Sequence, residues 1–82
     1  MFENNNQIAN QHFMPNGKPV PEVMLESELI QFLRLEEIGV KHPANTLRYY
    51  REKGKLKPTC IGGRNVYTIQ SALRFLENLT KR

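Results

Sequence analysis

Residues 46–58 of the chain read TLRYYREKGKLKP, a stretch with two distinct faces when it is wound as a helix. At about 100° per residue, Leu47 and Tyr50 fall on one side together with the preceding Ala44, and this side is predicted to pack against a core. The other side carries amide, guanidinium, phenol and carboxylate groups, from Asn45, Arg48, Tyr49 and Glu52. The amide, guanidinium and phenol groups of this side can read base edges in a DNA major groove or hold phosphates.

The same stretch predicts where the helix ends. Gly54 adopts the left-handed C′ conformation without steric cost, and Pro58 prevents a further helix. Leu56 offers an apolar anchor among three lysines, Lys53, Lys55 and Lys57. A short basic helix is often only a solvated surface helix, so the neighbouring sequence decides between that interpretation and a binding face.

The residues that follow, 60–76, read CIGGRNVYTIQSALRFL. Residues 46–58 resemble the recognition-helix motif of MerR-type transcriptional regulators. Residues 60–76 resemble the wing and last helix of excisionase-like proteins, which are small DNA-bending members of the same winged-helix superfamily. The resemblance spans roughly Leu25 to Leu79. It implies a small α+β winged helix-turn-helix domain, with three helices and a two-stranded β-hairpin wing, that binds double-stranded DNA.

The composition is that of one small soluble domain. The chain has 82 residues, of which 39% are apolar and 24% charged. No apolar run approaches the ~18 residues of a membrane span, and no signal peptide opens the sequence. The single cysteine, Cys60, excludes an intramolecular disulfide and a cysteine-cluster zinc site. A cytoplasmic protein without a cofactor or a membrane partner is therefore expected, and the resemblance implies association with the nucleoid of a bacterial or phage-infected cell.

Charge is distributed unevenly along the chain, whose net charge is +4. Residues 1–40 hold two basic and six acidic groups, whereas residues 41–64 hold seven basic groups and one acidic group. Segregation of this kind suits a surface that binds a polyanion, attached to a neutral-to-acidic support.

The chain divides into an arm, residues 1–24, and a domain, residues 25–82. The arm is rich in asparagine and glutamine, lacks an apolar period, and is predicted to be disordered or extended. A first helix is predicted to begin near Ser27 as its N-cap. The expected core positions of this helix and the turn after it are Leu25, Leu29, Phe32, Leu33, Leu35, Ile38 and Val40.

The second helix has two candidate starts. Pro43 suits the N1 position, which makes His42 the cap, while Asn45 would be the cap of a helix that begins later. The turn before it is longer than the resemblance to MerR-type proteins implies, so the register of Asn45 stays open.

After Pro58 the apolar period changes from helical spacing to two. Residues 59–61 and 65–68 predict the strands of a hairpin joined by a glycine-rich turn with Arg64 at its tip. We expect Ile61 and either Val66 or Tyr67 to face the core.

Thr68 then caps a last helix. Phe75 forms a second apolar edge of this helix. The main apolar stripe, which is predicted to close the core against the first helix, is Ile69, Ala72, Leu73, Leu76 and Leu79.

The candidate DNA-binding residues are Lys41, Asn45, Arg48, Tyr49, Arg51, Lys53, Lys55, Arg64 and Asn65. Arg48 would contact a guanine edge or a phosphate, and Arg64 would enter a narrow minor groove. The resemblance implies that Tyr49 holds the DNA backbone. It also implies a role in directing recombinase excision or in transcriptional regulation, with an integrase or a second copy of the chain as a partner on the DNA.

Other function classes fit the sequence less well. A paired acid and base, a phosphate-binding glycine loop at a helix start and a cluster of metal ligands are all missing from the sequence, which argues against an enzyme. The main alternative is a protein-interaction adaptor whose basic face docks on an acidic partner. Single-stranded RNA binding is less favoured, because no aromatic stacking platform is evident.

Overall fold

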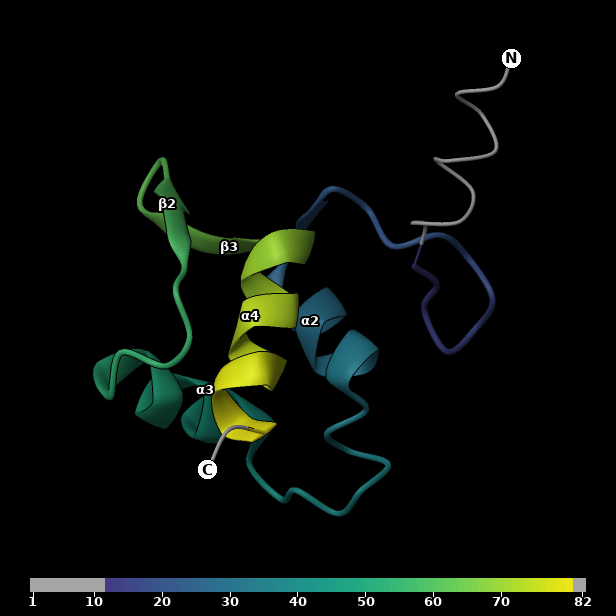
Figure 1. The fold of residues 1–82 in the computed structure, drawn as a ribbon, viewed down its shortest axis with the longest axis horizontal. Helices are drawn as coiled ribbons and strands as arrows, with labels where there is room; N and C mark the ends of the chain where they lie inside the picture. The colour runs from purple at the N-terminus through teal and green to yellow at the C-terminus, as the bar shows by residue number, and fades with distance from the viewer. Residues whose placement is uncertain (1–11, 81–82) are drawn as a thin grey trace.

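The computed structural model describes residues 12–80, which form a small α+β domain with three helices and a three-stranded antiparallel sheet (Figure 1). The helices are α2 (Glu26–Leu33), α3 (Pro43–Glu52) and α4 (Ile69–Thr80). The strands are β1 (Val23–Met24), β2 (Thr59–Ile61) and β3 (Arg64–Thr68). In Figure 1, α4 crosses the middle of the molecule, α3 lies at the lower left and the β2–β3 hairpin projects at the upper left. The predicted α+β class with three helices is confirmed.

The sheet has the order β1-β3-β2, so β3 is its central strand. In β1, Val23 pairs with Thr68 and Met24 pairs with Tyr67. The prediction that the sheet consists of a two-stranded hairpin alone is therefore wrong in its strand count, because β1 adds a third strand beside β3. A strand of two residues carries no usable period, so only its pairing with β3 in the folded chain reveals it.

Gly62 and Gly63 form the two-residue turn of the β2–β3 hairpin. Both have positive φ, 59° and 80°, a conformation that glycine adopts without strain. Ile61 pairs with Arg64, so Arg64 is the first residue of β3 and stands beside the tip. The expectation that Ile61 faces the core is wrong, because β2 is an edge strand and this side chain is 60% exposed.

The N-terminal cap differs from the prediction in α2 but agrees with it in α4. α2 begins at Glu26 with Leu25 as N-cap, and the backbone N–H of Leu25 donates to the Glu28 carboxylate at 2.8 Å. The prediction that Ser27 is the cap is therefore wrong by two residues. In α4 the Thr68 hydroxyl accepts from the backbone N–H of Ser71 at 3.0 Å, which confirms the predicted cap.

α3 takes the earlier of its two candidate starts. His42 is the N-cap residue and Pro43 occupies the first turn, where its missing N–H costs nothing. Lys53 is the C-cap and Gly54 follows with φ 78°, as predicted. Leu56 is 1% exposed, so it anchors the turn after α3 in the core.

α4 is rotated relative to the predicted leucine stripe, so that Ala72 and Phe75 are its buried residues. The Phe75 ring lies 5.2 Å from the Tyr50 ring, and Asn78 donates from Nδ2 to the Lys55 carbonyl at 3.1 Å. Both contacts turn this edge of α4 inward. Residues predicted to be core that lie at the surface instead, here and elsewhere, are Leu25, Ile38, Ala44, Leu73, Leu76 and Leu79.

The core reaches further toward the N-terminus than the predicted domain boundary at Leu25. Met14, Val20 and Met24 are buried together with residues of all three helices. Residues 12–24 thus contribute to the core, and residues 1–11 of the predicted arm lie outside the part of the chain that the structure describes.

Candidate nucleic-acid interface

The exposed face of α3 carries four polar side chains within two turns of helix. Asn45, Arg48, Tyr49 and Glu52 follow the spacing i, i+3, i+4, i+7, and all four are exposed. Leu47, on the opposite side, is fully buried. The burial of Leu47 therefore fixes the direction in which the polar face points.

The Tyr49 side chain is held between two neighbours. Its ring lies 5.2 Å from the Tyr50 ring at an interplanar angle of 75°, an edge-to-face contact. The Lys53 ammonium lies 5.4 Å from the Tyr49 centroid, within the range of a cation–π interaction. A phenol and a cation thus occupy one patch at the C-terminal half of α3, while the Tyr49 side chain stays 54% exposed.

An open groove runs along the first two turns of α3. Lys41 precedes the helix, Asn45 lies in its first turn and Tyr49 in its second, and all three line the groove. These three predicted site residues are therefore brought together. The remaining lining residues are Val40, His42, Thr46 and Tyr50.

A second open hollow lies at the hairpin. Arg64 and Asn65 line it from β3, and Glu26 lines it from the first turn of α2. Arg64 and Asn65 are both exposed beside the tip of the hairpin. In Figure 1 the hairpin and α3 lie on the same side of the molecule, at its upper and lower left.

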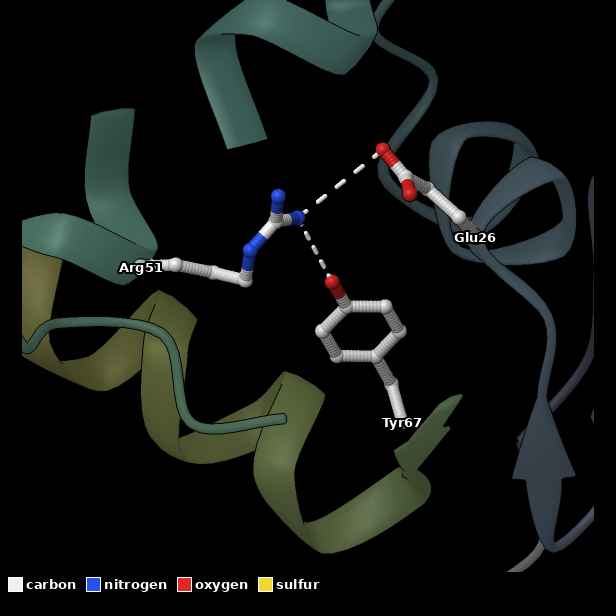
Figure 2. A network of polar contacts seen from close by, with 3 residues as sticks. All are labelled: Glu26, Arg51 and Tyr67. Atoms are coloured by element: carbon white, nitrogen blue, oxygen red, sulfur yellow. Dashed lines mark hydrogen bonds and ion pairs between the residues drawn. The ribbon is translucent and has the colours of Figure 1, made fainter. Parts of the chain in front are cut away.

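Arg51 behaves differently from the other predicted contact residues. Figure 2 shows its guanidinium between two side chains of other elements, the Tyr67 hydroxyl of β3 and the Glu26 carboxylate of α2. Arg51 Nη1 donates to the Tyr67 hydroxyl at 2.9 Å and lies 3.9 Å from Glu26 Oε2. The Arg51 side chain is only 19% exposed, so it is turned away from the polar face of α3.

Burial raises the pKa of the Tyr67 hydroxyl above its ordinary value of 10.0. The hydrogen bond and the charge of Arg51 act in the opposite direction, and the charge of Glu26 adds to the increase. The raised pKa means that the neutral phenol is favoured in the fold, where it accepts a hydrogen bond from Arg51.

Glu36 and Glu37 lie in the turn after α2, where they line a pocket with Ile30 and Arg34. Arg34 Nε forms an ion pair with Glu37 Oε1 at 3.5 Å, and both side chains are largely exposed.

The structure leaves all but one of the predicted contact residues at the surface. Arg51 is the exception, and sequence patterns gave no signal for its partners Glu26 and Tyr67, because the three come from separate elements. The exposed residues are Lys41, Asn45, Arg48, Tyr49, Lys53, Lys55, Arg64 and Asn65.

Metal ligands do not cluster within residues 12–80: nowhere do three or more His, Cys, Asp or Glu side chains come close enough to hold an ion. None of the three helices of this region combines the length and the apolar character that crossing a membrane requires.

Comparisons with protein-family models, curated proteins and solved structures return no match for this chain.

Proposed function

We propose that the chain binds double-stranded DNA sequence-specifically as a winged helix-turn-helix domain. In this proposal α2 and α3 form the helix-turn-helix, α3 enters the major groove, and the β2–β3 hairpin is a wing that reaches the adjacent minor groove. The observation that carries the proposal is the exposed polar face of α3, which joins an amide, a guanidinium and a phenol in helical register.

Each exposed residue has a role that follows from its chemistry. Arg48 makes a bidentate contact with a guanine edge or binds a phosphate, and Asn45 reads a neighbouring base. Tyr49 and Lys53, which touch each other, hold one stretch of the DNA backbone. The remaining contacts neutralise phosphates or reach the minor groove, through Lys41, Lys55, Arg64 and Asn65.

The biological role follows from the resemblance of residues 46–76. Binding of this kind serves either to direct an integrase toward excision or to regulate transcription, and a second copy on the DNA or an integrase is the expected partner. Both roles require the same interface, so one binding experiment tests their common basis.

The experiment is a selection from a random-sequence DNA duplex library, followed by gel shifts on an enriched and a scrambled duplex at several salt concentrations. We expect one sequence to be enriched, and we expect affinity to fall linearly in log–log form with salt. Equal affinity for the two duplexes would contradict specific binding. Failure to bind either duplex at about 50 mM salt would favour the adaptor, which needs charge but no base contacts.

A further inference from the structure

The Arg51 side chain connects the two separate parts of the candidate interface. It leaves α3 one turn after the buried Leu47, at the edge between the core side and the polar face, and reaches the Tyr67 hydroxyl, in the strand that carries Arg64 and Asn65. Its other partner, Glu26, lines the hollow in which Arg64 and Asn65 lie. Figure 2 shows the guanidinium between the Tyr67 hydroxyl and the Glu26 carboxylate, so Arg51 links α3 to β3 and to α2.

Within residues 12–80, the Arg51–Tyr67 bond is the one side-chain hydrogen bond that joins α3 itself to the sheet. The other polar links to this region hold the backbone of the turn after α3 to α4, from Ser71 to the Lys57 carbonyl and from Asn78 to the Lys55 carbonyl. Apart from apolar packing in the shared core, where Leu47 and Tyr67 are both buried, this partly buried bond is therefore the one side-chain polar tie between α3 itself and the sheet in the described residues.

We propose that Arg51 is a positioning residue, which holds the hairpin at a fixed distance and angle from the exposed face of α3. The bond acts on the hairpin through Tyr67, which is fully buried and two residues after Asn65 on the same face of β3. Because two DNA contacts reinforce each other more strongly when their spacing is preorganised, this bond sets how much the hairpin contributes to the choice of binding site.

The first test needs no DNA, so it stands whether or not the proposed function is correct. Cys60 is the single cysteine of the sequence and lies exposed on β2, and Ala44 is exposed on α3. Spin labels on Cys60 and on an introduced Ala44→Cys report the distribution of distances between hairpin and helix. Tyr67→Phe keeps the buried ring and removes only the hydroxyl, and Arg51→Met keeps the apolar stem and removes the guanidinium.

We expect both substitutions to widen the distance distribution. The matched control is Tyr49→Phe, which removes a hydroxyl from α3 outside the Arg51 network and should leave the width unchanged. Unchanged widths for Tyr67→Phe and Arg51→Met would overturn the proposal. So would equal widening in the Tyr49→Phe control, because the effect would then not belong to the Arg51–Tyr67 bond.

The second test rests on the proposed function and uses two duplexes that carry the selected site. One extends under the hairpin and the other stops short of it. Tyr67→Phe should weaken binding to the long duplex about three- to tenfold, the range of one hydrogen bond, and leave the short duplex unaffected. In an Arg64→Ala background the same substitution should have no further effect.

Equal weakening on both duplexes, or additive effects of Tyr67→Phe and Arg64→Ala, would mean that the bond stabilises the domain without positioning the hairpin. If the wild-type protein prefers no sequence at all, the proposed function fails. The spin-label distances still decide the role of Arg51 in that case.

Discussion

The rings of Tyr50 and Phe75 pack edge to face, with centroids 5.2 Å apart and an interplanar angle of 63°. This contact joins α3 to α4 and is an edge-to-face arrangement that aromatic pairs favour. Neighbouring residues in a helix are about 100° apart, so seating Tyr50 inward turns Arg48 and Tyr49 outward. The packing of α4 thus decides which face of α3 is free for a partner.

Phe75→Ala should destabilise the domain by about 3–5 kcal/mol, a large part of the ~5–15 kcal/mol available to a small domain. Leu73→Ala on the same helix is the matched control, since Leu73 is 36% exposed and should cost about 1 kcal/mol or less. Urea unfolding measures both values. A larger cost at Leu73 would restore the leucine stripe that the sequence predicts as the core face.

Met14→Ala should lower the free energy of unfolding by about 2 kcal/mol, because Met14 is only 8% exposed and belongs to the core. Its neighbour Phe13 is 54% exposed, so Phe13→Ala should have little effect although it removes a larger side chain. Thermal unfolding of the two variants tests whether residues 12–24 are part of the cooperative unit. Equal melting temperatures would place Met14 outside it.

Tyr67 makes stability depend on pH in the alkaline range. Its pKa is raised in the folded protein above the unfolded value of 10.0, mainly by burial. The folded state therefore holds the proton more tightly, and the resulting stability is fully present below about pH 10 and is lost as pH rises through the folded pKa. The free energy of unfolding of the wild type should fall relative to that of Tyr67→Phe as the pH rises above about 10. Parallel curves for the two proteins would contradict the raised pKa.

Lys53→Ala and Arg48→Ala should weaken DNA binding in different ways. Lys53 is expected to neutralise a phosphate, so its removal should weaken all sequences alike and reduce the salt slope by about one. Arg48→Ala should cost roughly 1–3 kcal/mol on the selected site and little on scrambled DNA, if Arg48 reads a base. Gel-shift titrations on both duplexes separate the two patterns. Identical losses for the two variants would favour a purely electrostatic face.

Arg64→Ala should affect the DNA that flanks the α3 site. Arginine is favoured in the narrow minor groove of A·T tracts, where the negative potential is enhanced. Replacing an A·T-rich flank by a G·C-rich one should therefore weaken the wild type more than the variant. Equal sensitivity of both proteins to the flank would exclude Arg64 as a reader of groove width.

Local patterns were sufficient for the two faces of α3 and for its end. The spacing around Leu47 and Gly54 at the helix end each act within one or two turns, so the sequence alone predicts them, whereas it leaves the start open between His42 and Asn45 as caps. Thr68 as a cap and Leu56 as an anchor are predicted for the same reason, as are the exposed polar residues of α3.

Tertiary packing decided the rest. β1 forms through the pairing of Met24 with Tyr67 of β3. α4 turns Phe75 inward because the Phe75 ring packs against the Tyr50 ring of α3. A helix can rotate about its axis by tens of degrees to improve its packing against neighbouring elements. The sequence pattern alone therefore could not show that Leu73, Leu76 and Leu79 are exposed in the fold. For the charged residue Arg51, too, the sequence alone could not predict the partners of the side chain. Its type and place on a basic helix suggest a phosphate contact, but Tyr67 and Glu26, 16 residues after it and 25 before it in the chain, meet its guanidinium only once three elements have packed.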